Sequence, residues 1–85
     1  MISQRREIRG IPQWLLCEYL LELGGEIQED GTIAGEGWRA RLQQIEDYQL
    51  GSLRVGQVEM LLEVEPAQQT IIIPALEKKL LRAGG

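Results

Sequence analysis

Residues 57–65 read Gln-Val-Glu-Met-Leu-Leu-Glu-Val-Glu, and this stretch decides the fold. From Val58 to Val64 an apolar side chain stands at every second position, with mostly acidic side chains between them. This period of two is typical of a β-strand with one buried face. Residues 38–43, Trp-Arg-Ala-Arg-Leu-Gln, alternate in the same way. The two segments therefore predict an antiparallel sheet with one apolar and one polar face.

The later of these strands is expected to run from about residue 50 to 65, after a turn at residues 46–49. Leu53 and Val55 fall on the opposite parity to the apolar residues that follow them. We therefore expect a β-bulge at Gly56 that exchanges the two faces of the strand.

Glycines divide the residues that precede these two strands. Asp30-Gly31 separates two short runs, 26–29 and 32–34. This dipeptide favours a two-residue hairpin turn because both of its positions tolerate positive φ. A glycine at each end of residues 35–37 predicts a bend or bulge after the second run.

A helix is expected at residues 11–23, behind a polar edge strand at residues 2–8. Pro12 suits the first helical turn, where its missing N–H needs no partner. Gly24 and Gly25 supply a left-handed stop.

The segment after Pro66 has two interpretations. Thr70 and the three isoleucines that follow it have strand composition, yet residues 66–73 could also open a helix kinked at Pro74. From Pro74 onward the pattern is helical, with leucines four residues apart and cations near the end.

The predicted order is strand, helix, four strands, helix, in a single domain of residues 1–85. The simplest packing is a two-layer α+β domain, in which a curved antiparallel sheet carries both helices on one face. This order is found in TBP-like folds, and a ferredoxin-like domain is the alternative.

Composition excludes several functions. The chain has no His and one Cys, so it can form neither a Ser-His nor a Cys-His nucleophile pair, nor an internal disulfide or Cys-cluster metal site. The 9 Lys and Arg against 13 Asp and Glu give a net charge of -4, which argues against nucleic-acid binding. We expect no catalytic residues, no metal and no cofactor. A polar N-terminus and the lack of a long apolar run predict neither a signal peptide nor a membrane span, and so a cytoplasmic protein.

The helix at residues 11–23 carries apolar side chains around most of its circumference, more than one sheet face can bury. We therefore expect an interface for self-association or for another protein, with Trp14, Leu15 and Tyr19 as candidates and Leu61 on the polar face of its strand. The alternative is a helix buried on several sides within the monomer.

A possible anion site is formed by Arg39 and Arg41, which share one strand face, and by Arg54 if it lies beside them on the next strand. Such a row could hold a carboxylate or phosphate through paired hydrogen bonds. The alternative is cross-strand pairing of these arginines with acidic side chains.

The C-terminal Gly84-Gly85 resembles the ends of ubiquitin-like modifiers and sulfur carriers, which are activated at the terminal carboxylate. A ubiquitin-like carrier is therefore an alternative function. An ordinary helix stop would explain the same glycines.

The whole chain resembles the small C-terminal domain, of unknown function, that is attached to some MoaD-related proteins. MoaD is the sulfur-carrier subunit of molybdopterin synthase. The resemblance implies a TBP-like fold and a non-enzymatic role accessory to a sulfur-carrier or molybdopterin pathway, with no catalytic residues to carry over. The matching residues are Arg9 to Pro12, Trp14-Leu15, Gly24-Gly25, Gly37-Trp38, Gly51 to Val58 and Leu81 to Gly85.

Overall fold

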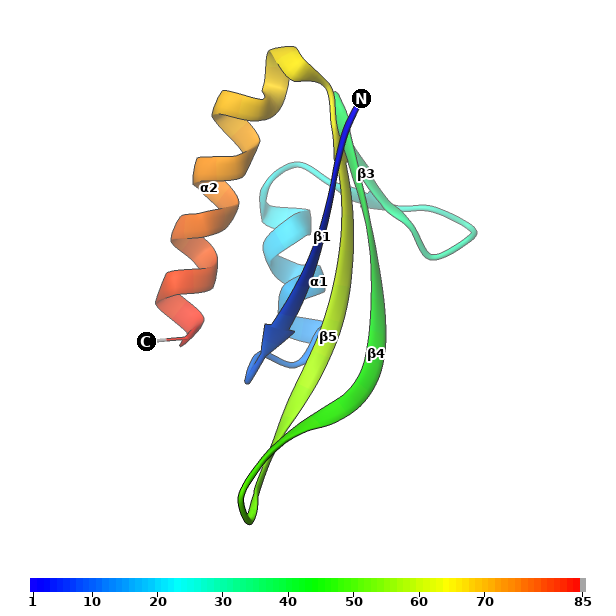
Figure 1. The fold of residues 1–85 in the computed structure, drawn as a ribbon. Coiled ribbons are helices and arrows are strands. Elements are labelled where there is room, and N and C mark those ends of the chain that lie inside the picture. The colour runs from blue at the N-terminus through cyan, green and yellow to red at the C-terminus, as the bar shows by residue number, and fades with distance from the viewer. Residues whose placement is uncertain (85) are drawn as a thin grey trace.

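The computed structural model describes residues 1–84 and has the predicted order of elements (Figure 1). The elements are β1 (Ile2–Arg9), α1 (Gln13–Glu22), β2 (Glu26–Ile27), β3 (Ile33–Gly35), β4 (Trp38–Leu50), β5 (Leu53–Val64) and α2 (Pro66–Gly84).

The five strands form one open antiparallel sheet in the order β1-β5-β4-β3-β2. Both helices cover the same face, with α2 beside β1 and α1 behind it in Figure 1. The α+β class and the strand-helix-four strands-helix order are therefore confirmed. The ferredoxin-like alternative does not have this order of elements.

The β4–β5 hairpin forms the centre of the sheet and most of its buried face. Trp38 lies opposite Val64 in the antiparallel register. Two residues further on, Ala40 lies opposite Leu62. All four side chains are at most 3% exposed. Burying a large apolar side chain contributes roughly 1.5–3 kcal/mol, so this row is a main source of stability.

The helices supply the other half of the core. Leu16 and Leu20 of α1 and Leu76 of α2 are fully buried against the sheet. α1 is a residue or two shorter at each end than predicted. The predicted glycine stop is present: Gly24 has φ +98, and the Gly25 N–H donates to the Leu20 carbonyl at 3.0 Å.

The turn between the two long strands was predicted at the wrong residues. Residues 46–49 continue β4, and Leu50 pairs with Leu53 around the two-residue loop Gly51-Ser52. Gly51 takes φ +62, the positive value needed at the first position of a type II′ hairpin turn. The conformational freedom of this glycine therefore decides the turn, rather than the polar composition of the residues before it.

The irregularity expected at Gly56 lies opposite that residue, in β4 rather than in β5. Ile45 pairs with Gln57. The next pair is Tyr48 with Val55, so two residues of β4 face Gly56 alone. The side chains of β5 therefore alternate between the two faces without interruption. In β4 the extra residue exchanges the faces on which odd and even residues lie.

Side chains fasten this bulge from the polar face of the sheet. The Gln57 amide donates to the Glu46 carbonyl at 3.0 Å, and Arg9 Nε donates to Gln57 Oε1 at 3.0 Å. The Arg9 guanidinium also lies 3.7 Å from the centroid of the Tyr48 ring. Gln57 is only 8% exposed, and these bonds satisfy its polar atoms.

The β2–β3 hairpin is present, but its turn has three residues rather than the predicted two. The Gly31 N–H donates to the Gln28 carbonyl at 3.0 Å, and the Gln28 N–H donates to the Thr32 carbonyl at 2.7 Å. Gly31 takes φ +85. This arrangement, with a left-handed glycine in the last loop position, is a common three-residue hairpin.

Residues 66–73 are helical, which settles the open alternative. α2 begins at Pro66, where a missing N–H costs nothing, and the Gln68 N–H donates to the Glu65 carbonyl at 2.9 Å. Ile72 and Leu76, four residues apart, are both buried under the helix. Packing on the sheet therefore outweighs the strand propensity of the isoleucines, and Pro74 lies inside the helix.

Gly35 packs so closely against the Trp38 ring that no side chain fits at this position. A Cβ at Gly35 would collide with the Trp38 indole, whereas a Cβ at Gly56 would meet nothing within 4 Å. We expect Gly35→Ala to lower the free energy of unfolding by about 1–3 kcal/mol, the usual cost of overpacking. Gly56→Ala should change it by less than about 1 kcal/mol. Urea denaturation measures both, and equal effects of the two variants would contradict this packing.

Candidate interaction site

The face of the sheet that lies away from the helices is charged. Arg5 of β1 binds Glu59 of β5, with Nε and Nη2 2.8 and 2.7 Å from Oε2. Arg39 of β4 binds Glu63 of β5 through Nε at 2.7 Å. Cross-strand pairing with acidic side chains, the alternative weighed for the arginine row, thus accounts for Arg39.

The predicted row of three arginines is only partly assembled. Arg39 and Arg41 lie on one face of β4, because they are two residues apart. Arg54 does not join them. It pairs with Gln49 near the hairpin tip, whereas Arg41 lies opposite Leu61. Seven residues of strand separate Arg54 from Leu61, which is roughly 23 Å at the usual rise.

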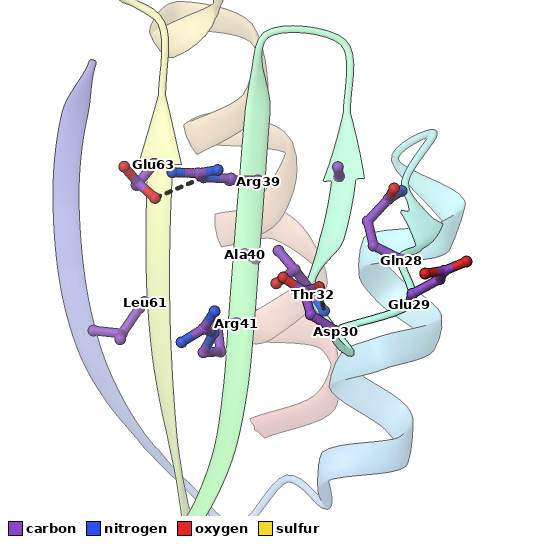
Figure 2. Close-up of a pocket in the computed structure, with 10 residues that line it drawn as sticks. Gln28, Glu29, Asp30, Thr32, Arg39, Ala40, Arg41, Leu61 and Glu63 are labelled. Carbon is purple, nitrogen blue, oxygen red and sulfur yellow. Dashed lines mark hydrogen bonds and ion pairs between the residues drawn. The ribbon is translucent and has the colours of Figure 1, made fainter.

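A shallow recess of about 810 Å³ lies on this face, between the β2–β3 turn and β4. Arg41 has no ion pair or side-chain hydrogen bond within residues 1–84, and Figure 2 shows its side chain on the Leu61 side of β4. Acidic groups share the recess, so its charge is mixed. The lining residues are Gln28, Glu29, Asp30, Thr32, Ala34, Arg39, Ala40, Arg41, Leu61 and Glu63.

Two carboxyl groups in this recess have lowered pKa values. The Thr32 backbone N–H donates to Asp30 Oδ1 at 2.9 Å, and this bond lowers the pKa of Asp30. The hydrogen bond from Arg39 lowers the pKa of Glu63, and the same contact raises the pKa of Arg39. Both carboxylates therefore stay ionised to a lower pH than free carboxyl groups of their kind.

The four interface candidates do not form one surface. Trp14 is 64% exposed on α1, whereas Leu15 and Tyr19 are half-buried and pack against the core. Lys79 of α2 lies 5.8 Å from the Tyr19 ring centroid, so contacts within the chain bury much of this helix. Leu61 is 40% exposed on the opposite face of the sheet. Of the α1 candidates, Trp14 is the one that faces solvent.

Trp14 borders a second recess, of about 470 Å³, between the start of α1 and the part of the β4–β5 hairpin beside the bulge. We call this the Trp14 recess. Glycine at positions 10 and 56 leaves the space open, because no side chain fills it. The sequence named Trp14 as an interface candidate but gave no sign of the recess, which joins three distant segments. Its lining residues are Gly10, Ile11, Pro12, Gln13, Trp14, Gln44 and Gly56.

The C-terminal glycines, metal binding and membrane spans remain to be compared with the described residues. Gly84 is the last residue of α2, and Gly85 lies outside the described residues, so the carrier tail is untested. Within residues 1–84, no cluster of three His, Cys, Asp or Glu could hold a metal ion. Neither helix, over the same residues, is long and apolar enough to cross a membrane.

Fold and surface together define a small α+β domain with an open antiparallel sheet and an exposed aromatic recess. The model of one protein family, the archaeal MoaD-like proteins, matches residues 4–85. The chain therefore belongs to the archaeal MoaD-like protein family. No curated protein matches it significantly.

The lowered pKa values predict how this face responds to acid. Each carboxylate stabilises the fold above its ordinary pKa, and this contribution is lost as the pH falls through the lower folded-state pKa. In a ¹³C NMR titration we expect Asp30 and Glu63 to titrate below their ordinary values of 3.8 and 4.5. Arg39→Gln should raise the Glu63 midpoint and leave the Asp30 midpoint low. A Glu63 midpoint that does not move would rule out the ion pair.

Proposed function

We propose that this domain is a non-enzymatic protein-interaction module, accessory to a sulfur-carrier or molybdopterin pathway in the cytoplasm. The observation that carries the proposal is Trp14, a large aromatic side chain left 64% exposed at the edge of an open recess. Membership of the archaeal MoaD-like family supports the choice of pathway, because MoaD is a sulfur-carrier subunit.

An exposed tryptophan gives up the stability that its burial would contribute, and it can contribute binding energy at an interface instead. A small soluble domain gains stability by burying such a ring, yet α1 turns Trp14 outward while burying Leu16 and Leu20. Interfaces concentrate their binding energy in a few Trp, Tyr and Arg side chains set beside pockets. Trp14 and its recess have this form, and a partner could place an apolar side chain beside the ring.

The flanking chemistry defines the kind of partner. The recess contains the amide side chains of Gln13 and Gln44 and no charged side chain. Gly10 and Gly56 line it without a side chain, and the Gly10 N–H donates to the Gly56 carbonyl. A protein segment with an apolar side chain fits this lining better than a small anion does, because the lining residues supply an aromatic ring and no cation.

Trp14→Glu tests the proposal in a co-purification experiment. The chain, tagged at its N-terminus to leave Gly85 free, is used as bait in cytosol from its own source. We expect a sulfur-carrier or molybdopterin-synthesis protein to co-purify with the wild type and to be lost with Trp14→Glu. Truncating a hot-spot tryptophan costs roughly 2 kcal/mol or more, which is about thirtyfold in affinity.

Leu81→Glu is the matched control, because Leu81 is 74% exposed on α2, away from the recess. It should retain the partner. Equal loss with both variants, or capture that is unchanged by Trp14→Glu, would contradict docking at the recess.

The ubiquitin-like carrier remains a second candidate, favoured by the family match that extends to Gly85. In that case the terminal carboxylate is converted to a thiocarboxylate, with one oxygen replaced by sulfur. Intact-mass analysis of the protein from its own source detects that exchange. Deleting Gly84-Gly85 should then abolish function, and full function without them would eliminate the carrier.

A small-anion binder is the third candidate, and it is favoured by Arg41, which has no ion pair with any residue from 1 to 84. Phosphates, nucleotides and pterins can be screened by thermal shift. A ligand at 100 times its dissociation constant stabilises the fold by about 2.7 kcal/mol. Stabilisation that disappears in Arg41→Gln would support this candidate, and no shift with any anion would remove it.

A further inference from the structure

β1 is an edge strand of eight residues, and among residues 1–84 it pairs only with β5. The Gly10 N–H donates to the Gly56 carbonyl at 2.9 Å, and this bond fixes the phase of the ladder. Because antiparallel strands alternate the direction of their backbone groups, the even residues of β1 bond to β5. The N–H and C=O groups of Ser3, Arg5, Glu7 and Arg9 therefore point to the open side.

Open edges invite pairing with another strand, and proteins commonly protect them with charges. The charges on the open side of β1 repel a second copy in some registers and attract it in one. Arg5 and Glu7 lie two residues apart on the same face. In an antiparallel pair with Arg6 on the twofold axis, Arg5 of each copy lies opposite Glu7 of the other.

This register differs from its neighbours in charge. Moving the second copy by two residues in one direction places Arg5 opposite Arg5, and in the other direction it places Glu7 opposite Glu7. Like charges directly opposite each other destabilise a strand pair. In the register centred on Arg6 the odd residues of both copies also exchange backbone hydrogen bonds, about eight in all.

Glu7 has an electrostatic reason to accept a second arginine. Within the chain it lies directly opposite Glu59, an unfavourable like-charge pair. Arg5 binds Glu59 at 2.7 Å but approaches Glu7 only to 3.8 Å. Both Arg5 and Glu7 keep about half of their side-chain surface exposed, at 56% and 44%. Arg5 of a second copy would neutralise Glu7 from the open side.

The helical face of β1 permits the same arrangement. Arg6 is the residue that would meet its own copy at the axis, and it already forms an ion pair with Glu77 of α2. This pairing reduces the repulsion between the two guanidinium groups. Figure 1 shows β1 in front, with α2 beside it and no other element between β1 and the viewer.

We propose that two copies of the chain associate through their β1 strands, antiparallel and centred on Arg6, to form a continuous ten-stranded sheet. This dimer is independent of docking at the Trp14 recess, because β1 and α1 present different surfaces. An eight-residue strand pair is a small interface, so the dimer is weak and concentration-dependent. The charges select the register more than they contribute affinity, because exposed ion pairs stabilise little.

Charge reversal at Glu7 and at Arg5 tests this dimer, because each variant alone should weaken it and a mixture of the two should restore it. Glu7→Arg and Arg5→Glu each place like charges opposite each other twice across the axis. We expect each variant alone to dimerise roughly tenfold more weakly than wild type in sedimentation equilibrium at low salt. An equimolar mixture of the two variants restores opposite charges at both contacts, so it should recover dimers. Circular dichroism confirms that each variant is folded.

Two controls show whether the dimer forms at the β1 edge. Glu36→Arg makes the same change of charge in the exposed β3–β4 turn and should leave dimerisation unchanged. Trp14→Glu should also leave it unchanged, which distinguishes failure here from failure of the docking proposal. Amide hydrogen exchange should slow at Ser3, Arg5 and Glu7 as the concentration rises. A wild-type monomer at millimolar concentration, or a mixture that recovers no dimer, would overturn the proposal.

Discussion

The fold depends on the antiparallel contact between the inward faces of β4 and β5. This contact places Trp38, Ala40, Leu62 and Val64 in a single buried row. The helices stabilise the domain by packing on this face of the sheet and on each other, as the contact between Lys79 and Tyr19 shows. A chain of this size buries a modest fraction of its surface, so no other cluster could replace the row. Every other feature, including both recesses, is placed by where these two strands begin, bend and end.

Local pattern predicted most of this architecture. Alternation along residues 57–65 and 38–43 was enough to identify the central strands and their inner faces, since a half-buried strand needs that period. Glycine and proline marked the start and end of α1 for equally direct reasons. Residues 66–73 could not be assigned from propensity, because Ile72 is helical through its tertiary contacts with the core.

The errors in turns and pairing have a common cause. The turn at Gly51 and the bulge opposite Gly56 depend on the register between β4 and β5. That register cannot be read from the sequence of either strand alone. The same cause separated Arg54 from Arg41, since the position of a residue on the next strand depends on where the hairpin turns. The Trp14 recess was missed because it exists only where three segments meet around glycines. The excess of apolar side chains on α1 made Trp14 an interface candidate, but burial within the monomer was the alternative and only the packed structure decides between them.

The sheet and helices packed around the central hairpin therefore leave two distinct surfaces exposed, an aromatic recess on the α1 side and an open edge at β1. The most direct test of docking at the Trp14 recess is an NMR titration of the ¹⁵N-labelled chain with a purified sulfur-carrier or molybdopterin-synthesis protein from the same source. We predict that the Trp14 indole N–H and the amides of Gly10 and Gly56 shift first and furthest. Saturating partner without shifts at these groups, or with shifts confined to the recess around Arg41, would contradict docking there.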